Sequence, residues 1–213
     1  MNNISSAIKT YKEFKTPIHN NIVILKNNNS IGEVFLSEEF CLRPLASCVS
    51  YPESTPDTIE SVINFFRTID LSFKTYLNIN IAPSRVGAVE EINRLLDKEL
   101  DTRKYYIVFN KEDSPIGIFY VYNFNSEWRK CNIAVGLSER YKGKGLASII
   151  AKEVSKCLKD QGLVRIGLDV EVTNTPSLTV CDKLENEGFI VKEGTLLNYF
   201  GKGVDIVSYS VTL

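Results

Sequence analysis

The sequence predicts one domain of the α/β or α+β class, built on a mostly antiparallel sheet with a single strand–helix–strand crossover. Two observations lead to this prediction. Short apolar runs with a period of two, separated by turn residues, recur along the chain and are typical of strands. At 143–162 the period changes to 3.6, and a strand-like run stands on each side of this amphipathic segment. A chain of 213 residues that is 44% hydrophobic is long enough to bury one core.

Residues 1–38 are predicted to form an extension that precedes a domain at 39–213. Within the extension, the apolar runs 21–26 and 31–36 flank the turn-forming stretch NNNS, and this spacing predicts a hairpin. The run 40–45 is expected to begin the main sheet.

Two amphipathic helices are predicted after this strand. In the first, at 55–70, Thr55 is suited to the N-cap and Pro56 to the first helical position. The second runs through 84–102. Both carry apolar residues at helical spacing: Ile59, Val62, Phe66 and Ile69 in the first, and Val89, Ile92, Leu96 and Leu100 in the second.

The remaining segments are assigned by the same two periods. Strands are predicted at 104–109, 115–123, 128–137, 164–172, 188–194 and 204–213. Helices are predicted over 143–162, closed by Gly162 near the C-cap, and from Asn174 to about Glu187.

The balance of charges and the spacing of the cysteines limit the classes of function that fit this sequence. The 25 basic and 26 acidic side chains lack the basic excess of a nucleic-acid binder. The five cysteines include no CxxC pair, so we expect neither a disulfide framework nor a metal site. No stretch approaches the ~18 consecutive apolar residues of a membrane span, and residues 1–15 lack the apolar core of a signal peptide. We therefore expect a cytoplasmic protein without nucleic-acid or membrane partners.

The segment 135–147 carries the clearest chemical signal. A strand ends, a glycine-rich turn follows, and an amphipathic helix starts at once. Helix N-termini leave N–H groups unpaired and carry partial positive charge, while Gly143 and Gly145 allow close approach to the backbone. Three cations surround the same turn: Arg140, Lys142 and Lys144. Together these features predict a site for a phosphate or pyrophosphate.

Spacing distinguishes this turn from other phosphate-binding loops. A nucleotide-hydrolysing P-loop requires a hydroxyl residue where Gly145 stands, which excludes that class. A dinucleotide fingerprint requires a third glycine where Ser148 stands, which disfavours it. The plain alternative, in which the glycines only shape a strand-to-helix turn, stays open at this point.

The pattern Arg140-x-x-Gly143-x-Gly145-x-Ala147 resembles the cofactor motif of the GNAT superfamily of N-acetyltransferases. The same resemblance extends to Asn174-x-x-Ser177, Lys183-Leu184, Gly188-Phe189 and Leu42-Arg43-Pro44-Leu45. The last of these is similar to the opening of the ribosomal-protein alanine N-acetyltransferase branch. The resemblance covers 39–213 and implies a mixed, mostly antiparallel sheet of about seven strands with helices on both faces.

This resemblance implies acetyl-CoA as the cosubstrate and no metal. The turn would hold the pyrophosphate through Arg140, Lys142, Gly143, Lys144, Gly145, Leu146 and Ala147. The strand end at Val135, Gly136 and Leu137 would pair with the pantetheine arm and polarise the thioester carbonyl. Asn174 would bind pantetheine from the following loop, and it is equally suited to cap a helix.

The resemblance also indicates candidates for the two proton transfers of amide formation. Family members often carry a tyrosine seven residues after the asparagine, and this chain has Cys181 there. Ser177, one helical turn earlier, is the preferred acid and Cys181 the second, although a buried apolar thiol is the plainer interpretation of Cys181. Glu171 or Asp169, which share one strand face, is the candidate base, although a solvated carboxylate is the plainer interpretation of either, and water can replace a base.

Three functions are compared. The first is an N-acetyltransferase that acetylates a primary amine, either a peptide N-terminus or a small molecule, by direct attack in a ternary complex, as a monomer or homodimer. The second is an acyl-CoA-binding sensor or scaffold with reduced catalysis, which the missing tyrosine favours. The third, antibiotic or polyamine acetylation, requires an acidic cleft. Glu90, Glu91 and Asp97 are available for one, but they are expected on the solvated face of their helix.

Overall fold

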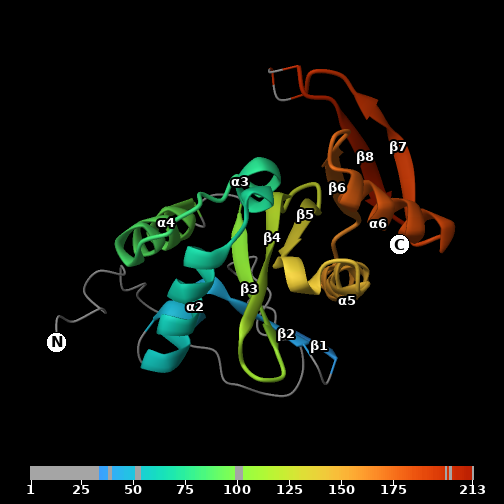
Figure 1. Ribbon diagram of the computed structural model, residues 1–213. Coiled ribbons are helices and arrows are strands. Elements are labelled where there is room, and N and C mark those ends of the chain that lie inside the picture. Colours follow the sequence, from blue (N-terminus) through green and yellow to red (C-terminus); the bar gives the residue numbers. More distant parts are fainter. Residues whose placement is uncertain are drawn as a thin grey trace.

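Eight strands form one continuous sheet in the computed structural model, which describes residues 34–37, 40–50, 54–98, 103–199, 201 and 203–212 (Figure 1). The strands are β1 (Val34–Ser37), β2 (Phe40–Pro44), β3 (Lys104–Asn110), β4 (Pro115–Asn125), β5 (Lys130–Leu137), β6 (Arg165–Glu171), β7 (Ile190–Leu196) and β8 (Ile206–Val211). Their order is β1-β2-β3-β4-β5-β6-β8-β7, and every neighbouring pair is antiparallel except β5 and β6. The predicted mostly antiparallel sheet is confirmed.

The first strand lies in the range predicted as an extension. In β1, Val34 stands opposite Leu42 and Phe35 opposite Cys41 of β2. This strand adds an eighth to the about seven that were expected. The hairpin partner predicted at 21–26 lies outside the described residues.

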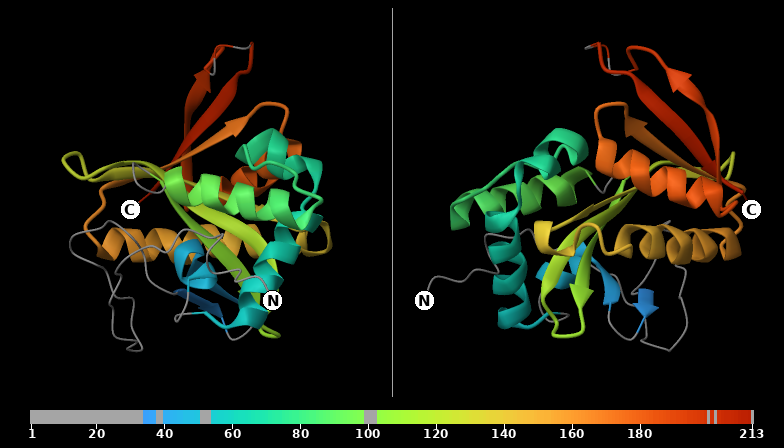
Figure 2. Two further views of the ribbon diagram at one scale, coloured as in Figure 1. Left: turned by 90° about the vertical axis from the view of Figure 1, so that its left-hand side faces the viewer. Right: turned by 45° about the vertical axis from the view of Figure 1, so that its right-hand side comes forward.

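Two helices cover one face of the sheet, α5 (Leu146–Asp160) and α6 (Thr175–Asn186) (Figure 2). Their apolar residues, among them Ile150 and Leu184, share a core with sheet residues such as Ile166 and Tyr209. The helix α5 also forms the crossover between the two parallel strands, as the change of period predicted.

The other face is covered by α1 (Leu45–Val49), α2 (Pro56–Thr68), α3 (Leu71–Leu77) and α4 (Arg85–Lys98). Phe66, Phe73 and Ile92 of these helices form a second core with Ile107 and Ile118 of the sheet. Helices on both faces, which the resemblance implied, are therefore confirmed.

The predicted start of α2 is confirmed by its cap. The Thr55 hydroxyl oxygen accepts from the Thr58 amide at 3.2 Å, and Pro56 occupies the first turn. The helices α1 and α3 were not predicted, because five and seven residues are too few for a clear helical period. Asp70 caps α3 by accepting from the Ser72 amide at 2.8 Å.

The parallel strands β5 and β6 diverge, and this divergence positions the candidate site. They pair only where Lys130–Asn132 face Arg165–Gly167. We call this paired region the vertex. Beyond it, β5 continues to Leu137 beside β4 alone, while β6 continues to Glu171 beside β8. One edge of each strand is therefore left without a neighbouring strand (Figure 1).

Candidate active site

The glycine-rich turn joins the open end of β5 to α5. A short 3-10 helix, η2 (Glu139–Tyr141), precedes it, and Gly143 and Gly145 adopt positive φ angles of 70° and 79°. A Cβ at either glycine would meet nothing within 4 Å, so the space beside the backbone of the turn is open. Within the described part of the chain, the amides of 143–147 have no protein acceptor. Exposed, unpaired amides at a helix N-terminus fit a diphosphate.

The side chains of two cations accompany this turn. Arg140 and Lys144 both lie against the Tyr141 ring, at 6.0 and 5.4 Å from its centroid. The Tyr141 hydroxyl accepts from the Asn110 side-chain amide at 3.1 Å, which anchors the turn to β3. Arg140 and Lys144 are exposed and stand beside the unpaired amides, where a diphosphate would need positive charge.

The third predicted cation, Lys142, points elsewhere. Its ammonium donates to Glu139 at 2.7 Å, Asp70 at 3.0 Å and Ser72 at 3.2 Å. Partial burial lowers the pKa of Lys142, but the bonds to the two carboxylates outweigh it and the pKa is raised. A role for Lys142 at a phosphate stays a prediction, whereas its contact with the N-terminus of α3 is a structural fact.

The open edge of β5 presents alternate backbone groups to the diverging strand. The Ser138 amide donates to the Ile116 carbonyl of β4 at 2.9 Å. Because backbone groups alternate along a strand, those of Val135 and Leu137 face away from β4, toward the side where β6 has separated. They are suited to pair with an extended arm. Gly136 has the opposite register and faces β4.

The start of α6 lies at the end of β6, across from the turn. The Asn174 side-chain oxygen accepts from the Ser177 amide at 3.3 Å, so its capping role is confirmed. Its NH₂ group and the Ser177 hydroxyl have no hydrogen-bond partner among the residues the structure covers. Cys181 is 2% exposed in the core under α6, and burial raises the pKa of its thiol to about 12. That environment supports the interpretation of Cys181 as a buried apolar thiol.

Asp169, one of the two predicted candidate bases, lies at the vertex of the two strands. Asp169 accepts from the Asn132 side-chain amide at 2.6 Å and from the Ser208 hydroxyl at 3.1 Å. Burial raises the pKa of Asp169 above its ordinary value, against the bond from Ser208. Glu171, two residues further along β6, accepts from the Thr173 hydroxyl at 3.4 Å.

Several residues around the site were not predicted: Asp70, Ser72, Tyr76, Tyr122, Asn132 and Ser208. The Tyr76 hydroxyl of α3 donates to the Thr173 carbonyl at 3.4 Å, which joins α3 to the loop before α6. A polar residue inside an otherwise apolar strand, as at Asn132, was an available signal. The sequence held no such signal for the contacts of α3, because they join residues that are far apart in the chain.

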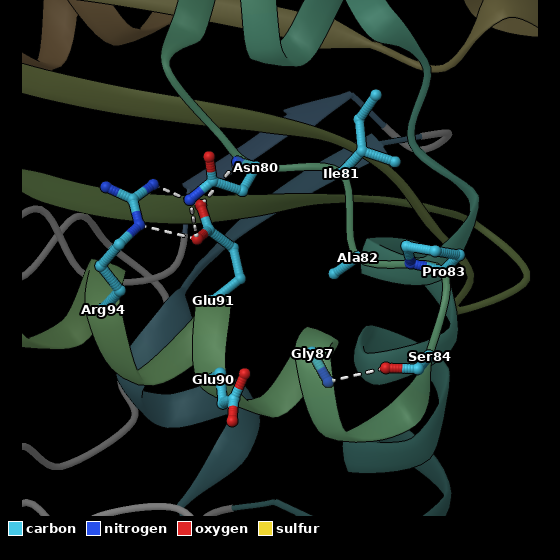
Figure 3. Close-up of a pocket in the computed structure, with 9 residues that line it drawn as sticks. All are labelled: Asn80, Ile81, Ala82, Pro83, Ser84, Gly87, Glu90, Glu91 and Arg94. Atoms are coloured by element: carbon cyan, nitrogen blue, oxygen red, sulfur yellow. Dashed lines mark hydrogen bonds and ion pairs between the residues drawn. The ribbon is translucent and has the colours of Figure 1, made fainter.

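A shallow cavity of about 330 Å³ lies between α4 and the loop before it, and residues of the turn do not line it (Figure 3). Glu91 is only 4% exposed there, so its predicted place on a solvated face is wrong. Its carboxylate accepts from the Asn80 amide at 2.8 Å and pairs with Arg94, whose guanidinium also donates to the Asn78 carbonyl at 2.8 Å. Glu91 therefore fixes the loop, and Glu90 remains exposed at the rim.

The described residues also bear on two other features, a metal site and a membrane span. Within 34–37, 40–50, 54–98, 103–199 and 203–212, no three His, Cys, Asp or Glu residues are grouped so that they could hold a metal ion. Over the same residues, each helix is too short or too polar to cross a membrane.

Comparison with solved structures identifies the same fold elsewhere. An acetyltransferase from Salmonella typhimurium that modifies the N-terminal serine of a 50S ribosomal protein is 16% identical, with a TM-score of 0.64 over 85% of this chain and 99% of that one. A ribosomal-protein alpha-N-acetyltransferase bound to coenzyme A is 17% identical, with a TM-score of 0.62 over 85% and 98%. Spermidine N-acetyltransferase from Vibrio cholerae, bound to coenzyme A and spermine, is 18% identical, with a TM-score of 0.58 over 82% and 96%.

Sequence comparison gives the family. No curated protein matches the chain. A family model described as "Acetyltransferase (GNAT) domain" matches residues 56–186, more than half of the chain. The matched range contains the turn, the diverging strands and the crossover helix between them. The chain therefore belongs to the GNAT family of acetyltransferases, which use acetyl-CoA as their acetyl donor.

Proposed function

We propose that this chain transfers the acetyl group of acetyl-CoA to a primary amine by direct attack in a ternary complex. One observation carries the proposal: the unpaired amides of 143–147 continue directly into the open edge of β5, which ends at the vertex with β6. A diphosphate at the turn and an arm along this edge would direct a thioester toward the vertex.

The predicted cofactor residues other than Gly136 and the Lys142 side chain would act in this arrangement as follows. The amides of the turn, with Arg140 and Lys144 beside them, would bind the pyrophosphate. The backbone groups of Val135 and Leu137 would pair with pantetheine, and one of these amides would polarise the thioester carbonyl. The NH₂ group of Asn174 would bind the arm from the side of α6.

The proton transfers need groups on both sides of the vertex. Ser177, with a half-buried hydroxyl in the first turn of α6, is the preferred acid for the departing sulfur. Cys181 stays the second candidate, since a thiol with a raised pKa keeps its proton. Glu171 and Asp169 are the candidate bases, on the face of β6 opposite to α5 and α6.

The substrates of the fold neighbours support a proposal for the class of acceptor. Those neighbours act on a ribosomal-protein N-terminus and on spermidine, which both carry primary amino groups. We therefore propose a peptide N-terminus or a small amine as the acceptor. The alternative is an acyl-CoA-binding sensor, which Cys181 in place of a tyrosine favours.

Binding and turnover must be measured separately to test this function. Acetyl-CoA affinity is determined by calorimetry, and thiol release is followed with N-terminal peptides, polyamines and aminoglycosides. Binding with turnover of an amine supports the transferase, binding without turnover of any amine supports the sensor, and loss of both refutes the two functions together.

The acid is tested by a matched pair of variants. Ser177→Ala is expected to lower kcat by about 10²-fold, in the range of general acid catalysis, with unchanged acetyl-CoA affinity. Cys181→Ala is expected to lower stability by creating a small cavity, with a smaller effect on kcat. The reverse pattern would assign the acid to Cys181.

A further inference from the structure

Asp169 lies at the vertex where β5 and β6 separate. The last paired residues of the two strands are Asn132 and Gly167, and Asp169 follows Gly167 on the same face of β6. The Asn132 side chain, across the vertex, donates to the Asp169 carboxylate at 2.6 Å. This face is opposite to α5 and α6, because Ile166 and Val170 of β6 belong to the core under those helices.

Neutral donors from three neighbouring strands surround this carboxylate. Besides Asn132 of β5, the Ser208 hydroxyl of β8 donates at 3.1 Å, and the Tyr122 hydroxyl of β4 forms a further hydrogen bond. The cation on the same strand, Arg165, is held by both carboxylate oxygens of Glu193 on β7. Within the described residues, Asp169 therefore has no ion-pair partner.

An anion held only by neutral donors in a partly buried position is unfavourable until a cation reaches it. Burial raises the pKa of Asp169, while the bond from Ser208 and the charge of Arg165 oppose the rise. An acceptor ammonium would supply the missing charge.

We propose that Asp169 binds the ammonium group of the acceptor and accepts its proton, so that this residue selects acceptors that arrive as cationic amines. The inference rests on the proposed function. One proton passes from nitrogen to the Asp169 carboxylate, and the freed lone pair forms the C–N bond as the C–S bond breaks. The departing sulfur takes a proton from the acid, for which Ser177 is the preferred candidate, and the second proton that nitrogen loses restores that acid. Asp169 then releases its proton to solvent, which restores the carboxylate.

The other carboxylates of this face are less suited to the task. The hydrogen bond from Arg165 holds the pKa of Glu193 at about 2, too low for a base near neutral pH. Glu171 stands further from the vertex and accepts from Thr173. Asp169 combines the vertex position with a raised pKa.

Asp169→Asn tests this proposal because it removes the charge with little change of shape. We expect kcat/KM for a primary amine to fall about 10²-fold, with acetyl-CoA affinity unchanged and the melting temperature no lower than that of the wild type. Amine binding to the coenzyme A complex, measured by calorimetry, should weaken as well. Asp160→Asn makes the same exchange at an exposed residue ending α5 and should change none of these quantities.

A second variant tests the role through pH. Ser208→Ala removes a donor that lowers the pKa of Asp169, so this pKa should rise further. The acid limb of the kcat/KM profile should then move to higher pH, since the carboxylate form appears later. The titratable and charged groups that act on Asp169 are retained in this variant: Tyr122, Arg165 and Glu193.

The outcomes separate the two proposals. Wild-type turnover that survives in Asp169→Asn, with an unchanged pH profile, refutes the inference and leaves the transferase function standing. A wild-type chain that acetylates no primary amine refutes the proposed function, and the inference fails with it.

Discussion

The ammonium of Lys142 lies 3.0 Å from the carboxylate of Asp70, and this contact joins the glycine-rich turn to the N-terminus of α3. The same ammonium donates to Ser72, the second residue of that helix. Burial raises the pKa of Asp70, but the bonds from Ser72 and Lys142 outweigh it, so the pKa is lowered. The turn and α3 are therefore held together by a charged hydrogen-bond network.

The helix α3 reaches two further parts of the site. It packs against Gly136 of β5, where an added Cβ would lie 2.3 Å from Leu77. Its Tyr76 hydroxyl donates to the carbonyl of Thr173, beside the start of α6. One short helix thus contacts the glycine-rich turn, strand β5 and the loop before α6, so it is placed to couple the cofactor and acceptor binding that we propose.

Lys142→Gln is predicted to loosen α3 with little loss of global stability. Both partners are about one third exposed, so the ion pair should contribute below about 1 kcal/mol. We expect the KM of the acceptor to rise more than the dissociation constant of acetyl-CoA. Lys144→Gln is the control: its ammonium lies against Tyr141 and not α3, so cofactor affinity should fall while acceptor KM changes little. Equal effects of both variants on the two constants would contradict this division.

Gly145→Glu is predicted to abolish acetyl-CoA binding in a folded chain. A side chain here meets nothing within 4 Å, but φ is 79°, so the backbone strain should cost about 1–2 kcal/mol. The added carboxylate would repel a diphosphate at the unpaired amides. Calorimetry should show at least a 100-fold loss of affinity, consistent with ~3 kcal/mol of lost and repulsive charge interactions.

Two alanine variants separate strain from charge in that experiment. Gly145→Ala carries the backbone cost without the carboxylate and should lose less affinity. Gly162→Ala carries a similar cost at φ 89°, also in open space, at the far end of α5. It should lower stability alone. Full acetyl-CoA affinity in Gly145→Glu would place the cofactor elsewhere.

The geometry of the glycine-rich turn was predictable from the sequence because its determinants are local. Gly143, Gly145 and the start of α5 are neighbours in the chain, and their backbone geometry follows from residue type. The start of α2 was predictable for the same reason, since Thr55 and Pro56 act within one turn.

The contacts around Asp70 and Asp169 were not predictable because they join distant segments. Lys142 and Asp70 are 72 positions apart, and Asn132 and Asp169 are 37 apart. Periodicity placed Asp169 on a strand face, but it did not show which polar groups stand opposite. Glu91 was mispredicted for the same reason. Its position in the helix indicated a solvent-exposed face, but the loop at Asn80 covers it.

Gly136→Ala is predicted to push α3 away from β5. The new methyl group would lie 2.3 Å from Leu77 and 3.1 Å from Phe73, and overpacking of this kind costs about 1–3 kcal/mol. Leu77→Ala removes the nearer of these clashes. The double variant should therefore be more stable than the sum of the two single losses predicts, by about 1 kcal/mol in urea unfolding. Strictly additive losses would show that the helix is not held at this glycine.

The stability of the chain should reveal the unfavourable charge on Asp169. Its folded pKa is raised, so its favourable contribution is complete below the ordinary value of 3.8 and is lost as pH rises through the folded pKa. Asp169→Asn stays neutral at every pH. The stability of this variant relative to wild type should therefore increase as pH rises from 4 to 7, as measured by urea unfolding.

Glu193→Gln, on the same face, should show the opposite pH dependence of stability relative to wild type. The hydrogen bond from Arg165 lowers the pKa of Glu193 from 4.5 to about 2, so the wild-type advantage is complete above pH 4.5 and fades as pH falls toward 2. The two variants should thus change in opposite directions relative to wild type when stability is followed against pH. If the Asp169→Asn and wild-type curves run parallel from pH 4 to 7, Asp169 does not carry a disfavoured charge, and a cationic acceptor gains nothing by meeting it.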